Sequence, residues 1–156
     1  MNPILYVLCG CPGCGKSYFG QHYSAAFNAF YVSRDKIRFS LLKDDEDYFA
    51  HEDEVFVRFY STIREYLKEG MNVIADATHI NIKSRKKLLN ALSNVDFDVI
   101  YVYFNTSFET CRERNSEREG RKYVPLKVMQ NMWDNFIIPT VTETKKCIGI
   151  MCVKGE

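Results

Sequence analysis

Short apolar runs alternate with longer amphipathic segments along the whole chain. The apolar runs predict β-strands at residues 4–9, 30–32, 72–76, 97–104 and 147–153. Apolar residues that recur every three or four positions predict helices at residues 16–26, 34–42, 52–69, 82–92, 107–118 and 126–136. Strands that alternate with helices form a parallel sheet that is covered on both faces. We therefore expect an α/β three-layer sandwich around a central parallel sheet of about five strands.

A glycine-rich stretch, Gly-Cys-Pro-Gly-Cys-Gly-Lys-Ser, fills residues 10–17 between the first strand and the first helix. It has the G-x-x-x-x-G-K-[ST] pattern of a phosphate-binding loop, or P-loop. Glycines let the backbone turn its amides toward an anion, the lysine reaches the β- and γ-phosphates, and the serine hydroxyl binds Mg²⁺. The predicted cradle comprises Gly10, Cys11, Pro12, Gly13, Cys14, Gly15, Lys16 and Ser17, with Ser17 as the Mg²⁺ ligand. The loop predicts ATP or another nucleoside triphosphate, and it leaves the phosphate acceptor open.

Composition and charge limit the partners that the chain can have. The length suits one domain, which we place at residues 1–156. The formal net charge is +1, so a nucleic-acid substrate would need a local basic patch. No apolar run approaches the roughly 20 residues that span a bilayer, and the first residues lack a signal-peptide pattern. We expect a cytoplasmic protein with no membrane partner.

Cys11 and Cys14 have the C-x-x-C spacing of a redox pair or of half a zinc site. A zinc site needs a second ligand pair, and the sequence has neither a second C-x-x-C nor an H-x-x-x-H. Because both cysteines lie inside the P-loop pattern, we interpret them as its variable positions. The alternative is a disulfide that distorts the loop and blocks nucleotide binding.

Carboxylates follow two of the predicted strands. Ligands of an open parallel sheet bind beyond the carboxyl ends of its strands, where Asp35 and Asp76 emerge together with Thr78. Asp35 is our candidate for the base that accepts a hydroxyl proton, and Arg38, three residues later, shares its helix face. The alternative is a capping carboxylate beside a surface arginine. Asp76 either supports a metal ion through a hydrogen bond to one of its ligands or is simply a hydrogen-bonded strand end.

Two charged segments could contact phosphates. Arg114 and Arg118 are four residues apart on the predicted helix 107–118, and Gly120 offers a hinge, so residues 107–124 are a candidate helical lid. The alternative is a solvated helix of arginine–glutamate pairs. The basic run 83–87, which includes Arg85, could hold acceptor phosphates or simply form a charged helix face.

Several short motifs together resemble the polynucleotide 5′-hydroxyl kinase family, and most of all its kinase modules of the T-even phage type. The resemblance covers residues 4–136, most of the chain. It is carried by Gly10-Cys-Pro-Gly-x-Gly-Lys-Ser17, Ser33-Arg34-Asp35-x-x-Arg38, Asp76-Ala-Thr with Asn81 and Arg85, Arg114-Asn115-Ser116-x-Arg118, and Val124-Pro125.

The resemblance implies a P-loop kinase that transfers the γ-phosphate of ATP to the 5′-hydroxyl of DNA or RNA. By the same resemblance, Asp35 is the general base, Arg38 holds the 3′-phosphate of the acceptor, and Arg114 and Arg118 contact the donor phosphates. It also places Asp76, Thr78 and Arg85 at the substrate. The implied partners are a 5′-hydroxyl nucleic-acid end, a second copy of the chain or separate repair enzymes.

The chain departs from the family at two points. Tyr18 stands where the family often has threonine, and the chain has no room for the phosphatase or ligase module that often accompanies the kinase. A small-molecule kinase acting on a nucleoside, sugar or other metabolite remains the alternative, since fold and loop fit it equally. A non-catalytic nucleotide-binding module is a third interpretation. It is disfavoured because the sequence has both a candidate base, Asp35, and candidate lid arginines.

Overall fold

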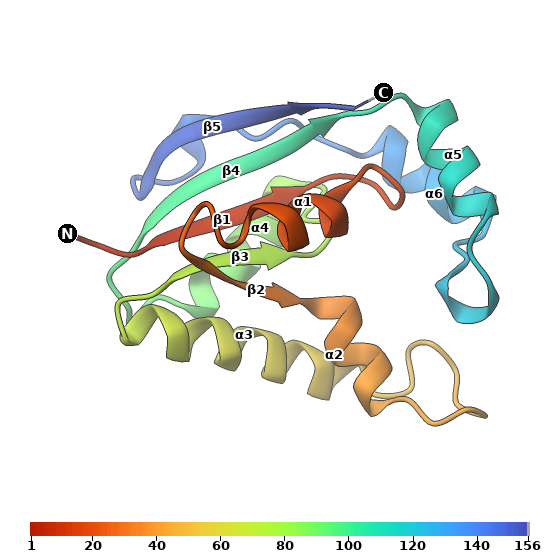
Figure 1. The fold of residues 1–156 in the computed structure, drawn as a ribbon, viewed down its shortest axis with the longest axis horizontal. Helices are drawn as coiled ribbons and strands as arrows, with labels where there is room; N and C mark the ends of the chain where they lie inside the picture. Colours follow the sequence, from red (N-terminus) through yellow and green to blue (C-terminus); the bar gives the residue numbers. More distant parts are fainter. Residues whose placement is uncertain (156) are drawn as a thin grey trace.

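The computed structural model describes residues 1–155 and contains one five-stranded sheet (Figure 1). The strand order is β2-β3-β1-β4-β5, and all neighbouring strands pair in parallel. This confirms the expected α/β fold with five parallel strands. The strands are β1 (Ile4–Cys9), β2 (Ala29–Ser33), β3 (Asn72–Asp76), β4 (Asp98–Asn105) and β5 (Cys147–Lys154).

Helices cover both faces of the sheet and make the sandwich three-layered. α3 and α4 pack on one face, whereas α1, α5 and α6 pack on the other (Figure 1). The helices are α1 (Lys16–Tyr23), α2 (Arg34–Leu41), α3 (Glu52–Lys68), α4 (Ile82–Ala91), α5 (Phe108–Ser116) and α6 (Leu126–Asp134), with short 3-10 turns η1 (Gly120–Lys122) and η2 (Val141–Glu143). None of these helices within residues 1–155 is long and apolar enough to cross a membrane.

The two faces of the central strand β1 anchor two separate halves of the core. Leu5 and Val7 point to the α3–α4 side, and Tyr6 and Leu8 point to the α1–α5–α6 side. This alternation is the period-two pattern of a strand buried on both faces. Each such buried side chain stabilises the fold by about 1.5–3 kcal/mol.

All five strands end at one edge of the sheet because they run in parallel. The P-loop, the start of α2 and the segment after β3 therefore meet there, and α5 and η1 lie beyond them (Figure 1). Most of the residues predicted to carry chemistry come from these segments; Arg85 on α4 is the exception.

Candidate active site

The P-loop has the backbone conformation that its glycines permit. Gly13 and Gly15 have φ values of +82° and +109°, in the region that side chains other than glycine rarely adopt. A Cβ on Gly13 would also lie 2.6 Å from the carbonyl oxygen of Cys111 on α5. Left-handed residues in such a loop help successive amides face a common anion, and Gly15 leads directly into the N-terminus of α1.

The ammonium group of Lys16 lies in the curve of this loop. The side chain is buried, and its Nζ donates to the carbonyl oxygens of Gly10 at 2.9 Å and Cys11 at 3.0 Å. A positive charge is thereby fixed beside the amides of the P-loop, which is the place where the sequence predicts the nucleotide phosphates.

Ser17 is linked to the end of β3. Its hydroxyl donates to Oδ2 of Asp76 at 3.1 Å, and the hydroxyl of Tyr31 donates to the same oxygen. Burial and the charge of Asp76 raise the pKa of Tyr31, which keeps the phenol protonated as a donor. Asp76 thus lies on the Ser17 side of the site, and the expected contact between Asp76 and the acceptor finds no support in this arrangement. Asp76 is therefore a hydrogen-bonded strand end next to the loop serine, and this position fits both roles considered for it.

Tyr31 is a site residue that sequence reasoning missed. Its ring crosses α1 at Gly20, where a Cβ would lie less than 3.0 Å from two ring carbons. The contact depends on how β2 pairs with β3 and on how α1 packs over both. No local pattern in the sequence signals it.

Asp35 and Arg38 lie on the same face of α2, as their spacing predicts. The side chain of Ser33 caps this helix by accepting from the backbone amide of Lys36 at 3.2 Å. Arg38 Nη1 donates to Asp35 Oδ1, and the hydroxyl of Tyr48 donates to the same oxygen at 2.9 Å. The Asp35 side chain is 61% exposed, so it remains open to a substrate hydroxyl.

Arg38 is enclosed by groups that occupy its donors. Glu52 at the start of α3 accepts from Nη2 at 2.7 Å and from Nε at 3.2 Å, a bidentate pair. Nη1 also lies 2.6 Å from the hydroxyl of Tyr48, and only 3% of the Arg38 side chain is exposed. The geometry therefore favours a role in orienting Asp35 over the expected direct contact with an acceptor phosphate. Sequence reasoning missed Glu52, which is the first of three consecutive acidic residues and has no distinguishing pattern.

The segment after β3 is fastened to β1. The carbonyl of Thr78 accepts from the amide of Gly10 at 2.9 Å, and Nδ1 of His79 donates to the carbonyl of Leu8 at 2.7 Å. His79 has a φ of +41°, an uncommon value for a residue with a side chain. These two hydrogen bonds fix the β3–α4 segment against the root of the P-loop.

Arg85 is not at the surface, in contrast to the expectation from the basic run. It is 1% exposed, and Glu143 accepts from its Nε at 2.9 Å and from its Nη2 at 3.0 Å. Nη1 donates to the carbonyl of His79 at 2.7 Å. The packing of α4 on the sheet turns this side chain inward. Arg85 therefore stabilises the β3–α4 segment, and we do not include it in the acceptor site.

Arg114 reaches the P-loop from α5, whereas Arg118 lies outside the helix. Nη1 of Arg114 donates to the carbonyl of Gly13 at 3.1 Å. The predicted helix 107–118 ends at Ser116, so the expectation that Arg114 and Arg118 share a helix face is wrong. The buried amide of Asn115 pairs with both backbone groups of Val124, at 2.7 and 3.0 Å, and closes residues 116–123 into a loop.

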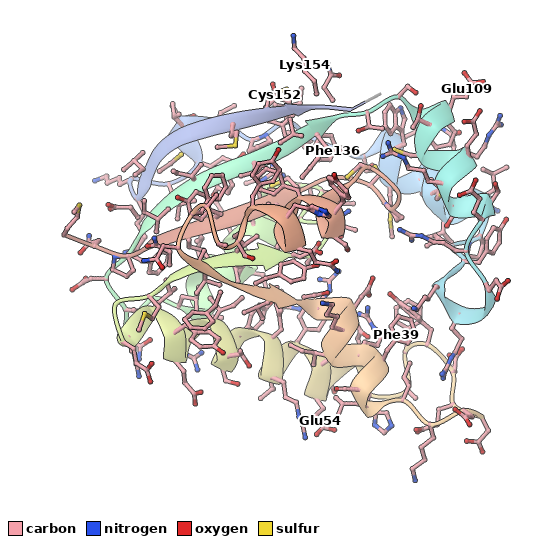
Figure 2. The ribbon with its side chains drawn as sticks, viewed as in Figure 1. Phe39, Glu54, Glu109, Phe136, Cys152 and Lys154 are labelled. Atoms are coloured by element: carbon pink, nitrogen blue, oxygen red, sulfur yellow. The ribbon has the colours of Figure 1, made fainter. Side chains whose placement is uncertain are left out.

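That loop touches the connection between α2 and α3. Nη1 of Arg121 donates to the carbonyls of Lys43 at 2.8 Å and Glu46 at 2.7 Å. The ammonium of Lys122 lies 5.7 Å from the ring centroid of Phe39, whose side chain is labelled in Figure 2. The segment expected to act as a lid therefore contacts α2 and the connection that follows it.

The cysteines of the P-loop are buried thiols. Cys11 and Cys14 are 3% and 4% exposed, and burial raises the pKa of Cys11 to about 12. Cysteines react as thiolates, so Cys11 is a poor nucleophile near neutral pH. Among residues 1–155 no cluster of three or more cysteine, histidine or acidic side chains is arranged to hold a metal ion.

The fold and the site together define a P-loop domain with the architecture of small kinases: a parallel sheet, a phosphate-binding loop after its central strand and a β3 carboxylate bonded to the loop serine. Comparison with known proteins agrees with this class. The family profile described as an AAA domain (AAA_33) matches residues 5–139. The chain therefore belongs to this AAA-domain family.

Individual relatives differ widely in what they act on. The chain is 27% identical over 138 residues to an L-seryl-tRNA(Sec) kinase from Methanococcus maripaludis, covering 87% of this chain and 53% of that protein. A chain in the structure of the Pnkp1/Rnl/Hen1 RNA repair complex is 25% identical, with a TM-score of 0.74, over 86% of this chain and 44% of its own. A gluconokinase from Sinorhizobium meliloti shares the fold at 18% identity, with a TM-score of 0.63, over 97% and 82% of the two chains. The chain thus spans about half the length of the seryl-tRNA kinase.

Proposed function

We propose that this protein is an ATP-dependent kinase that phosphorylates the 5′-hydroxyl of a DNA or RNA end. The observation that carries the proposal is the exposed carboxylate of Asp35, held by Arg38 and Tyr48 at the same sheet edge as the P-loop. A carboxylate in this position can accept the proton of a hydroxyl that attacks a phosphate bound by the loop.

The nucleotide half of the site fits ATP and Mg²⁺. Lys16 and the P-loop amides would hold the phosphates, and Ser17 with Asp76 would hold the metal, because oxygen ligands of this kind suit Mg²⁺. When bound, the ion neutralises charge on the phosphate oxygens. Arg114 beside Gly13, with Arg118 on the adjoining loop, would add positive charge over the donor phosphates.

We infer the type of acceptor by analogy with the relatives. One similar chain belongs to an RNA repair complex and one relative is a tRNA-directed kinase, which supports a nucleic-acid acceptor and separate repair enzymes as partners. The gluconokinase shares only the fold, so a sugar or another small molecule is the competing acceptor.

The test is a transfer assay with γ-labelled ATP and Mg²⁺. Acceptors are a 5′-hydroxyl DNA oligonucleotide, the matching RNA, free nucleosides, gluconate and serine-charged tRNA. We expect label on the oligonucleotides, and a loss of turnover of about 10²–10⁴-fold in Asp35→Asn with ATP binding retained. Asp45→Asn, which changes an exposed carboxylate on the α2–α3 connection, is the matched control and keeps full activity. Label on a small molecule or on the seryl group alone would overturn the polynucleotide proposal.

A further inference from the structure

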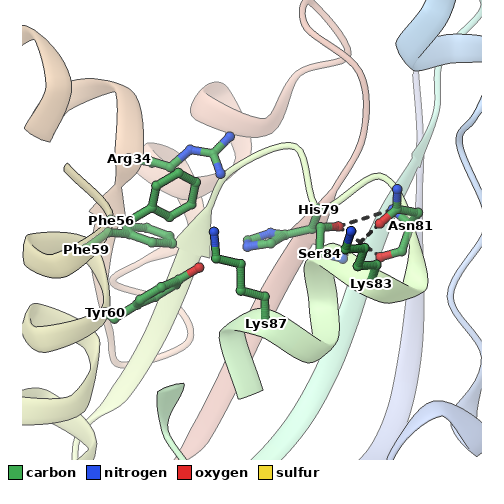
Figure 3. A pocket seen from close by; sticks show the side chains of 9 residues that line it. All are labelled: Arg34, Phe56, Phe59, Tyr60, His79, Asn81, Lys83, Ser84 and Lys87. Carbon is green, nitrogen blue, oxygen red and sulfur yellow. Dashed lines mark hydrogen bonds between the residues drawn. The ribbon is translucent and has the colours of Figure 1, made fainter. Parts of the chain in front are cut away.

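A cavity of about 260 Å³ opens between α3 and α4 (Figure 3). Its aromatic wall is formed by Phe56, Phe59 and Tyr60 of α3. Ligand sites usually range from about 300 to 1,000 Å³, so this cavity suits one small unit such as a single nucleotide. Aromatic rings that face a pocket offer flat apolar surfaces on which a base can stack.

Three cations, Arg34, Lys83 and Lys87, line the same cavity, and its lining within residues 1–155 includes no carboxylate. Arg34 and Lys87 share one ring: their charged groups lie 5.2 Å and 4.1 Å from the centroid of Phe56. No carboxylate among residues 1–155 lines this cavity to neutralise these charges, so an anion that entered it would be attracted to both cations.

Arg34 is less exposed to solvent than Lys87. Its Nε is buried and has no hydrogen-bond partner within residues 1–155. Burial, together with the nearby charge of Arg38, lowers the pKa of Arg34. A buried guanidinium donor without an acceptor is costly, and a phosphate oxygen would satisfy it.

His79 adds a hydrogen-bond acceptor to the cavity wall. Because Nδ1 donates to the carbonyl of Leu8, and because burial lowers the pKa of His79 to about 3, the ring is neutral and Nε2 carries a free lone pair. Figure 3 shows the ring extending from the β3–α4 segment toward the aromatic wall. A nucleobase amino group is the kind of donor that such a nitrogen accepts.

Arg34, which lines the cavity, is followed directly by the proposed catalytic residue Asp35 in the first turn of α2. The two arginines that the sequence suggested for acceptor phosphates have other partners: Arg38 is held by Glu52 and Arg85 by Glu143. The cations of the cavity are positioned to take that role instead.

We propose that this cavity binds one nucleotide unit of the acceptor, with its base against Phe56 and Tyr60 and its 3′-phosphate on Arg34 and Lys87. The inference rests on the proposed function in one respect, that the 5′-hydroxyl of this unit is the group presented to Asp35. A base and a phosphate each have a matching group in the cavity, whereas a neutral sugar would leave its cations unpaired.

The test is calorimetric titration of the full chain with adenosine 3′-monophosphate, adenosine or inorganic phosphate, with the P-loop filled by a non-hydrolysable ATP analogue and Mg²⁺. We expect the monophosphate to bind at least about tenfold more tightly than either of the other probes, because a charge-assisted phosphate contact supplies about that factor. Equal affinities for adenosine 3′-monophosphate and inorganic phosphate would show an anion site without base recognition and would overturn the proposal.

Lys87 and Lys86 provide a matched pair, since both are exposed on α4 and only Lys87 lines the cavity. We expect Lys87→Ala to lower the affinity for adenosine 3′-monophosphate by about tenfold and to leave the affinity for adenosine nearly unchanged. Lys86→Ala should change neither affinity. Phe56→Leu should lower the affinity for both adenosine 3′-monophosphate and adenosine. Equal effects of Lys87→Ala and Lys86→Ala would contradict the assignment.

The transfer assay separates this inference from the proposed function. If oligonucleotides are phosphorylated with the same acceptor KM in Lys87→Ala as in the parent, the cavity assignment fails and the kinase proposal stands. If no 5′-hydroxyl is phosphorylated while the monophosphate still binds in a Lys87-dependent way, the kinase proposal fails and the nucleotide cavity stands.

Discussion

Gly20→Ala tests whether the contact between α1 and Tyr31 holds the metal side of the site together. A Cβ at residue 20 would lie under 3.0 Å from Cδ1 and Cε1 of the Tyr31 ring and 3.1 Å from Cζ. The ring would have to move, and its hydroxyl would leave the carboxylate of Asp76.

Two destabilising contributions and one stabilising contribution set the change in the free energy of unfolding. Overpacking costs about 1–3 kcal/mol, and a lost hydrogen bond to a charged group costs about 1.5–3 kcal/mol. Alanine in place of glycine inside a helix returns about 1 kcal/mol. We therefore expect Gly20→Ala to lower the free energy of unfolding by about 1.5–5 kcal/mol, measured by urea denaturation with an unchanged m-value.

A double-mutant cycle gives the decisive control. Tyr31→Val removes the ring and keeps a strand-forming residue, so in that background Gly20→Ala should stabilise the protein by about 1 kcal/mol through helix propensity alone. The reasoning is refuted if Gly20→Ala is neutral in the parent, or if it costs the same in both backgrounds.

Three further predictions concern buried groups. Arg85→Met should destabilise the protein by about 3–5 kcal/mol in urea because it leaves Glu143 unpaired; the reasoning fails if Arg85→Met combined with Glu143→Leu is no more stable. The pKa of His79 is about 3 when folded and 6.5 normally, so stability should fall below pH 6.5, by about 2 kcal/mol at pH 5. An equal slope in His79→Gln would contradict that assignment. Transfer activity should be the same with and without reductant, and rapid disulfide-linked inactivation at Cys11 and Cys14 would instead support a redox switch.

Local patterns predicted the elements of the fold because strands and helices follow from the period of apolar residues. The strand at residues 72–76 has the predicted bounds. Helix ends were less predictable. The helix predicted for residues 107–118 stops at Ser116, because Asn115 bonds to Val124 and bends the chain back. That contact spans residues beyond the helix itself, so helical periodicity does not reveal it.

The site was predictable where it depends on neighbours in sequence and unpredictable where it depends on packing. The P-loop and the shared face of Asp35 and Arg38 follow from spacing alone. The pairing of Arg38 with Glu52, and of Arg85 with Glu143, depends on how distant helices and turns are placed. These two pairings occupy both arginines that the sequence suggested for an acceptor phosphate, and for this reason we propose the cavity at Arg34 for that role.

The two hydrogen bonds that fasten the β3–α4 segment to β1 have a consequence for how this architecture diversifies. The hydrogen bonds from Gly10 to Thr78 and from His79 to Leu8 attach that segment to the P-loop strand. The same segment also lines the proposed acceptor cavity through His79. The walls of the proposed acceptor cavity come largely from α3 and α4, which do not build the P-loop. Mutations there can therefore exchange one acceptor for another without rebuilding the nucleotide half, and an engineer who wishes to retarget the protein would randomise those two helices first.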